Sequence, residues 1–243
     1  MKTCIYIHGL ESKGNSRTAG ILCEEFAGIL GIVEPKIDYS DIQSVVETIK
    51  VAIAKSSSCF LIGSSMGGFV ALQFPSVPKI LINPALRPTE TGIAKRHPQL
   101  QSQLSTFLEL ERYIVEHEIQ NCNLGDREDS LFTYGLFGLN DELFSYRAEF
   151  ERDFNYTLPR NHIFTCPDGH RLSEATVRNQ LKTLIEYYLI DSTIFHESHP
   201  YYSTFPLFGF DEEEYKRLGI EPPSEERFAK LTADREKILS KLK

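Results

Sequence analysis

Residues 59–68 of the chain are Cys59-Phe60-Leu61-Ile62-Gly63-Ser64-Ser65-Met66-Gly67-Gly68. The first four are apolar without alternation, as expected of a strand covered on both faces, and the segment from Met66 to about Gln73 can form a helix. A serine flanked by glycines between a buried strand and a helix is typical of a nucleophile elbow. Gly63 and Gly67 would let the strand and helix approach closely, and the helix start would offer backbone N–H groups to an oxyanion. Glycine-rich turns without a catalytic function share this pattern, so the interpretation of Ser65 as a nucleophile needs support from the rest of the chain.

Composition narrows the class of protein. The chain has 243 residues, enough for one sizeable core, and its hydrophobic (41%) and charged (25%) fractions are ordinary for a globular protein. A formal net charge of −8 makes nucleic acid or an anionic membrane an unfavourable main partner. No stretch approaches the ~18 apolar residues of a membrane span, and the first residues lack a signal-peptide pattern. The five scattered cysteines show no metal-ligand spacing. We expect a cytoplasmic protein without a metal or cofactor, and a homo-oligomer is possible.

Short apolar segments alternate with helical patterns along the chain. The expected strands lie at about 5–7, 32–37, 59–62, 79–82, 131–137 and 162–165, and the expected helices at about 16–30, 42–53, 66–73 and 177–188. The helix after Asp41 is preceded by a capping-box pattern at Ser40–Gln43. This alternation favours an α/β fold with a parallel sheet and helices on both faces.

Two segments depart from the alternation. Residues 88–130 form an insertion with a helical pattern at Leu104–Tyr113, and a tail with aromatic and charged parts begins at Asp191. We therefore predict an α/β domain over residues 1–190 with a helical insertion at about 88–130. A C-terminal extension, 191–243, would pack on this domain or on a partner. The insertion helix could be a lid over a pocket or could simply pack on the core.

A nucleophilic serine needs a base, and the base needs an acid that orients it. Asp141 follows the predicted strand at 131–137, and His170 follows the one at 162–165. Both would lie at carboxyl ends of strands, where open parallel sheets bind ligands. For the acid we prefer Asp141 to Glu142, because it comes first after the strand and turn. Asp168 is the second choice, since it would have to fold back on a histidine two residues away.

The loop after the first strand would complete an oxyanion hole. Its residues are His8-Gly9-Leu10-Glu11-Ser12, and Gly9 would allow a tight backbone approach. The expected donors are the backbone N–H groups of Leu10 and Met66. We expect His8 to shape this loop and not to act as a base.

Several of these segments together resemble the YqiA-like esterases, a branch of the α/β-hydrolase superfamily. The matching pieces are Tyr6-Ile7-His8-Gly9-Leu10-Glu11-Ser12, Gly63-Ser64-Ser65-Met66-Gly67-Gly68-Phe69, Asn83-Pro84-Ala85-Leu86-Arg87-Pro88, Gly138-Leu139-Asn140-Asp141-Glu142 and Asp168-Gly169-His170. The resemblance covers about residues 2–188, and its most specific element is Asn-Pro-Ala-x-Arg-Pro. The chain departs from the family at three places. Arg171-Leu172 follows the histidine where the family tends to have an aromatic residue, the insertion at 88–130 is longer, and the tail beyond Asp191 has no counterpart.

The resemblance implies a minimal α/β-hydrolase with about five parallel strands. It implies hydrolysis of carboxylic esters or acyl-thioesters through Ser65 as nucleophile, Asp141 as acid and His170 as base, with an acyl-enzyme intermediate and no cofactor. Gly9, Glu11 and Arg87, which lie in the matching segments, are expected to contact the small-molecule substrate. Two alternatives remain open: a non-catalytic hydrolase-like binding protein, and an acyltransferase that uses the same triad.

Overall fold

The computed structural model describes residues 1–10, 12, 14–119, 133–154 and 163–189. Internal contacts divide the chain into two compact units, Met1–Asn155 with His162–Lys182, and Tyr156–Asn161 with Thr183–Lys243. Of the second unit, the structure describes residues 183–189, which are helical. The predicted C-terminal extension, 191–243, lies outside the described residues. The sheet and the candidate site belong to the first unit.

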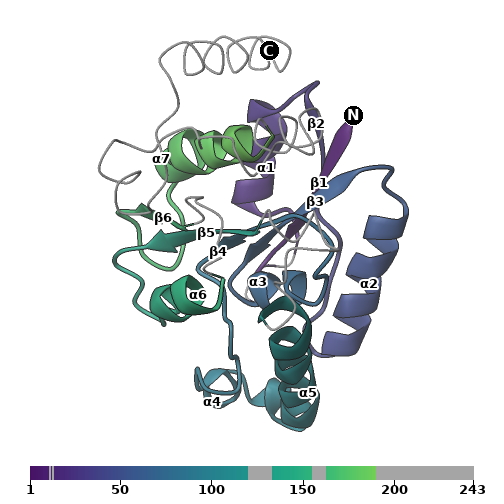
Figure 1. Ribbon diagram of the computed structural model, residues 1–243, viewed down its shortest axis with the longest axis vertical. Helices are drawn as coiled ribbons and strands as arrows, with labels where there is room; N and C mark the ends of the chain where they lie inside the picture. Colours follow the sequence, from purple (N-terminus) through teal and green to yellow (C-terminus); the bar gives the residue numbers. More distant parts are fainter. Residues whose placement is uncertain (11, 13, 120–132, 155–162, 190–243) are drawn as a thin grey trace, which may run out of the picture. The chain divides into compact units, whose positions relative to one another are not determined.

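Six parallel strands form a single sheet in the first unit, in the order β2-β1-β3-β4-β5-β6 (Figure 1). The strands are β1 (Lys2–Ile7), β2 (Leu30–Val33), β3 (Cys59–Ser64), β4 (Lys79–Ile82), β5 (Thr133–Gly138) and β6 (Ile163–Cys166). All five pairings between neighbours are parallel, which confirms the predicted class of sheet. The resemblance implied about five strands, and the sheet has six.

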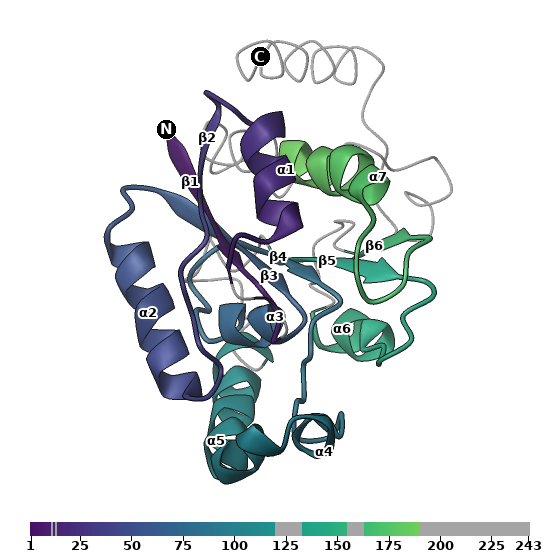
Figure 2. The same ribbon diagram turned by 180° about the vertical axis from the view of Figure 1, so that it is seen from behind.

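Helices cover both faces of the sheet (Figures 1 and 2). One face carries α1 (Arg17–Glu25) and α7 (Glu174–Thr176), which continues as the π-helix η4 (Val177–Leu181). The opposite face carries α2 (Ile42–Ala54), α3 (Met66–Ala71) and α6 (Arg147–Asp153). No helix among the described ranges is long and apolar enough to cross a membrane.

Two helix boundaries differ from the sequence prediction. The side chain of Asp41 caps α2 by accepting a hydrogen bond from the N–H of Ser44, so the cap lies one residue beyond Ser40. Helix α1 ends at Glu25 and not near Leu30, because Gly28 takes a positive φ of 78° that turns the chain. Leu30 then begins strand β2.

The insertion contains α4 (Ile93–Arg96), the 3-10 helix η1 (Pro98–Gln103), α5 (Leu104–Ile114) and the π-helix η2 (Val115–Ile119). Phe107 of α5 is fully buried, and its ring centroid lies 5.9 Å from that of Phe69 in α3. Helix α5 therefore packs on the helical layer over the sheet. This packing supports the core-packing interpretation of the predicted insertion helix.

Replacing Phe107 by alanine would leave a cavity between α5 and α3. We expect the Phe107→Ala variant to lose about 3–5 kcal/mol of unfolding free energy, measured by urea denaturation. The neighbouring Leu108 is 51% exposed, and Leu108→Ala should change the unfolding free energy by only about 0.5 kcal/mol. Equal losses for the two variants would show that α5 does not pack through Phe107.

Candidate active site

Ser65 lies at the turn from β3 to α3 in an unusual backbone conformation. Its φ is 55° and its ψ is −116°, values that non-glycine residues rarely adopt and that cost free energy. The end of β4 and the segment after it hold this residue from both sides. The N–H of Ser65 donates to the carbonyl of Ile82 (2.9 Å), and the N–H of Ala85 donates to the carbonyl of Ser65 (3.1 Å). These bonds offset the local strain and fix the position of the hydroxyl group.

The glycines around the serine have a steric function. A β carbon at Gly63 would collide with the backbone of Gly67, and one at Gly67 would collide with the carbonyl group of Ile7. A β carbon at Gly68 would lie only 2.7 Å from the β carbon of Pro84. The glycines thus let β3, α3 and the end of β1 meet, which agrees with the reason given for them from the sequence.

The structure brings together the three residues predicted as a triad. The hydroxyl of Ser65 lies 2.9 Å from Nε2 of His170, and Nδ1 of His170 lies 2.8 Å from Oδ2 of Asp141. With an ionised Asp141, the network assigns the proton of the neutral imidazole to Nδ1, so that Nε2 accepts from Ser65. The side chains of His170 and Asp141 are 8% and 2% exposed, so the hydrogen bond between them is shielded from water.

The second oxygen of Asp141 organises its own loop. Oδ1 accepts hydrogen bonds from the N–H groups of Leu143 (2.9 Å) and Phe144 (3.2 Å). The ring of Phe144 packs edge-on against the imidazole of His170, with centroids 4.8 Å apart. Asp141 therefore fixes both the polar partner and the apolar cover of the histidine.

The other two candidate acids have different partners. Glu142 accepts the backbone N–H of His170 at Oε2 (2.9 Å), and this bond, with the nearby charges of His170 and Arg171, lowers the pKa of its exposed carboxyl group. Asp168 accepts the N–H of Ser173 (2.6 Å), the residue that caps α7. Sequence reasoning missed the contact of Glu142 with the histidine loop, because spacing alone does not reveal which backbone group a carboxylate meets.

The loop after β1 lies directly against the nucleophile. A β carbon at Gly9 would lie 3.2 Å from the β carbon of Ser65, so a side chain at this position would require the turn at Ser65 to shift slightly. No acceptor is found in the described part of the chain for the N–H groups of Leu10 and Met66. Both predicted donors are therefore available at the ends of segments that meet at Ser65.

Tyr39 supports this loop from outside the predicted motifs. Its hydroxyl donates to the carbonyl of His8 (2.5 Å), and the two rings pack edge-on with centroids 6.0 Å apart. Burial raises the pKa of Tyr39, so its hydroxyl stays protonated and remains a donor. The imidazole of His8 is buried, and its Nδ1 donates to the carbonyl of Gly9 (2.8 Å). His8 therefore shapes the loop, as predicted.

The remaining predicted substrate contacts stay predictions. Glu11 lies outside the described residues. Arg87 pairs with Glu90 (3.3 Å), and its carbonyl accepts from the hydroxyl of Tyr146 (2.9 Å). Neither of these partners is a member of the triad. Among the described residues, no group of His, Cys, Asp or Glu is arranged to hold a metal ion.

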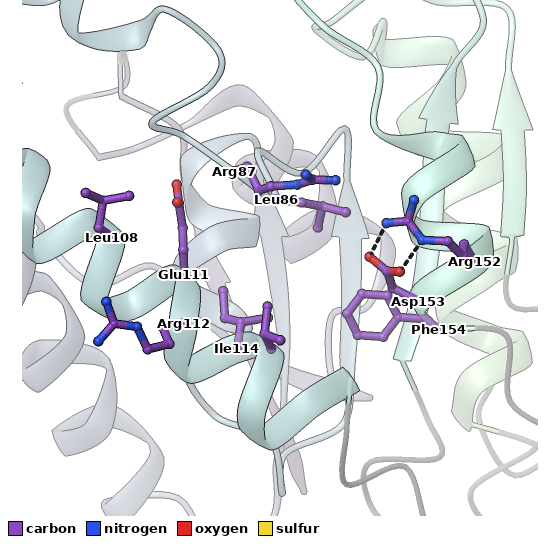
Figure 3. Close-up of a pocket in the computed structure, with 10 residues that line it drawn as sticks. Leu86, Arg87, Leu108, Glu111, Arg112, Ile114, Arg152, Asp153 and Phe154 are labelled. Atoms are coloured by element: carbon purple, nitrogen blue, oxygen red, sulfur yellow. Dashed lines mark hydrogen bonds and ion pairs between the residues drawn. The ribbon is translucent and has the colours of Figure 1, made fainter.

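A cavity of about 500 Å³ adjoins Arg87. Figure 3 shows its lining side chains on α5, on the end of α6 and on the segment after β4, with an ion pair between Arg152 and Asp153 on one side (2.6 Å). The lining residues are Leu86, Arg87, Leu108, Glu111, Arg112, Ile114, Val115, Arg152, Asp153 and Phe154. No triad residue is among those that line this cavity.

Comparisons with known proteins give the family and the fold. The model of the uncharacterised protein family UPF0227 matches residues 3–165, which include four of the five segments that carry the resemblance to YqiA-like esterases; Asp168-Gly169-His170 lies just beyond. A search of curated proteins finds no match.

Solved structures give the fold. Est1E from Butyrivibrio proteoclasticus superposes with a TM-score of 0.55 at 15% identity over 77% of this chain and 86% of its own. The ydeN gene product from B. subtilis superposes with a TM-score of 0.51 at 12% identity, over 76% of this chain and 99% of its own. A putative hydrolase from Agrobacterium vitis S4 superposes with a TM-score of 0.50 at 17% identity, over 76% of this chain and 88% of its own. The chain therefore has the α/β-hydrolase fold.

The bond from His170 to Glu142 makes a prediction about acid stability. A carboxyl group with a lowered native pKa stabilises the fold above its ordinary value of 4.5, and this contribution is lost as the pH falls through the lowered native value. We expect Glu142→Gln to lower the urea midpoint at about pH 7, and the difference from wild type to vanish near pH 3.

A matched control is Glu47→Gln, which changes an exposed glutamate of α2 that pairs with Lys50 (3.2 Å). This variant should follow the wild type at every pH. A difference between wild type and Glu142→Gln that stays constant with pH would contradict the assignment.

Proposed function

We propose that this chain, which belongs to the UPF0227 family of YqiA-like esterases, is a serine hydrolase that cleaves carboxylic esters or acyl-thioesters. The observation that carries the proposal is the continuous hydrogen-bonded chain from Ser65 through His170 to Asp141, with distances of 2.9 and 2.8 Å. A nucleophile within reach of a base, and a base oriented by an acid, is the arrangement that acyl transfer requires.

The chemistry follows from the positions of the protons. Ser65 Oγ attacks the acyl carbonyl carbon while His170 Nε2 takes the hydroxyl proton, and the buried carboxylate of Asp141 stabilises the imidazolium that forms. The imidazolium then gives this proton to the departing alcohol or thiol, which leaves an ester between the acyl group and Ser65. Water, deprotonated by His170, attacks this acyl-enzyme and releases the carboxylic acid. These steps need no metal or cofactor.

The oxyanion would be held by two backbone donors. Met66 N–H is at the start of α3, where helix geometry provides no acceptor for it, and Leu10 N–H follows the glycine that lies against Ser65. Such preorganised donors contribute strongly where water is excluded. Gly9 serves this site by its lack of a side chain, and Glu11 and Arg87 are proposed as further substrate contacts.

The surroundings of the histidine favour a substrate with an apolar acyl part. Phe144 covers one side of His170, and the same loop exposes Leu139 (62%) and Leu143 (45%) to solvent. Apolar side chains next to a polar reactive centre provide binding area for hydrocarbon groups while the polar atoms fix orientation.

Two other functions are compatible with the same fold. A hydrolase-like binding protein would need the pocket but not the strained serine, whose positive φ costs free energy without benefit to binding alone. An acyltransferase would share every step up to the acyl-enzyme and differ in the second nucleophile. Product analysis with added alcohols or amines separates transfer from hydrolysis.

Covalent labelling tests the nucleophile. We expect a fluorophosphonate probe to label the wild-type protein and not the Ser65→Ala variant, because the hydroxyl of Ser65 lies within reach of the imidazole of His170. The adjacent Ser64 is the last residue of β3, and Ser64→Ala should still be labelled. Failure of the wild type to label, or equal labelling of Ser65→Ala, would refute the hydrolase proposal.

Two adjacent carboxylates allow a test of the acid. Asp141→Asn should lower kcat for p-nitrophenyl ester hydrolysis by about 10⁴-fold, because the amide favours the wrong imidazole tautomer. Glu142→Gln removes a charge beside the same loop but leaves the imidazole bonded to Asp141, so its loss should be much smaller. The reverse order of losses would assign the acid to Glu142.

A further inference from the structure

We infer that Asn83 is a positioning residue that holds the loops of all three triad members at fixed distances. This inference deepens the proposed function, on which its kinetic part rests. Asn83 follows β4, the strand between the nucleophile strand β3 and the acid strand β5. No member of the triad comes from β4, so the role of its conspicuous Asn-Pro-Ala segment is otherwise unexplained.

The side-chain amide of Asn83 joins the base loop to the acid loop. Its Nδ2 donates to the carbonyls of Gly169 (3.1 Å) and His170 (3.0 Å), and its Oδ1 accepts from the N–H of Gly138 (2.8 Å). One planar group therefore bonds the backbone of His170 itself and the last residue of β5, three residues before Asp141. Only an amide side chain offers two donors and an acceptor in so short a span.

The backbone around Asn83 reaches the nucleophile. Its neighbours Ile82 and Ala85 accept from and donate to the backbone of Ser65, at 2.9 and 3.1 Å. The N–H of Asn83 donates to the carbonyl of Leu136 in β5 (3.0 Å). Three of the four residues from Ile82 to Ala85 thus hydrogen-bond to the chain at or near each triad member. They use backbone groups at Ser65 and the buried side-chain amide of Asn83 at the other two loops.

The conformation of Asn83 fits this role. Its φ is 43°, in the region where asparagine is several-fold enriched over other residues with a side chain. The residue is 3% exposed, so its three polar contacts are shielded from water and a lost contact would not be replaced by solvent. A surface turn would need neither the burial nor the three partners.

A purely structural link between the loops already exists elsewhere. The N–H groups of Leu139 and Asn140 donate to the carbonyls of Cys166 (2.9 Å) and Asp168 (3.0 Å). These bonds join the two loops through residues that precede His170 in the sequence. Asn83 is the residue whose side chain bonds the histidine's own carbonyl group, and its removal should affect the imidazole position more than the fold.

The test uses Asn83→Asp, which keeps the shape and the acceptor for Gly138 but replaces two donors by oxygen. The carboxylate would then face the carbonyls of Gly169 and His170 and push this loop away. We expect kcat for p-nitrophenyl butyrate to fall about 10- to 100-fold with little change in KM, as for a misplaced catalytic group. The downfield proton NMR signal of His170 Nδ1–H, bonded to Asp141, should shift or disappear.

Asn15→Asp is the matched control, because Asn15 is an exposed asparagine that also has a positive φ, of 57°. It should retain the wild-type kcat and the wild-type NMR signal. A folded Asn83→Asp variant with unchanged kcat and an unchanged signal overturns the inference. If the wild type shows the signal but neither hydrolyses esters nor reacts with fluorophosphonate, the proposed function is wrong. The inference about Asn83 is then tested by the NMR comparison alone.

A second variant and a wild-type measurement cover the case in which Asn83→Asp does not fold. Asn83→Gly permits the positive φ and removes all three side-chain hydrogen bonds. If this variant keeps the wild-type kcat and the wild-type NMR signal of His170, the inference is wrong. Hydrogen exchange of the Gly138 amide in the wild-type protein should be as slow as that of strand amides, because its acceptor is the buried Oδ1 of Asn83. Rapid exchange of this amide would equally overturn it.

Discussion

The contact between Gly67 and the carbonyl group of Ile7 leaves no room for a side chain, and the site depends on this closeness. It joins the start of α3 to the end of β1, so the two chain segments that carry the proposed oxyanion donors, the N–H groups of Leu10 and Met66, meet at one point. The sharp turn at Ser65 is the consequence, since the chain must leave β3 and enter the helix within a single residue. The backbone bonds from the segment after β4 then hold a conformation that would otherwise relax.

Much of the fold and the candidate site could be predicted from local patterns. Buried strands are apolar runs of four to six residues here, and polar residues directly after them lie at one edge of a parallel sheet. This rule alone places Ser65, Asp141 and His170 near one another, whatever the exact length of each strand. The glycines of the elbow could be interpreted because their steric reason acts over a few residues.

The residues that could not be predicted act through contacts distant in sequence. Tyr39 meets the carbonyl of His8 across 31 positions, and Asn83 meets His170 across 87. Neither partner is a side chain, so no pattern of residue types marks the pairing. Glu142 and Asp141 are neighbours in sequence, yet one binds the backbone of His170 and the other its ring. Only the path of the loop distinguishes them.

The position of β6 in the sheet determines when the site can form. Within the described residues, β6 pairs only with β5 and is the last strand along the chain. During synthesis, a chain that has emerged as far as β5 carries Ser65 and Asp141 but not the histidine that connects them. Domains generally fold as units during synthesis, so a partly made protein lacks the base that the proposed nucleophile needs. In the proposed mechanism, Ser65 becomes reactive only when the edge strand docks, and an incomplete chain would be chemically silent.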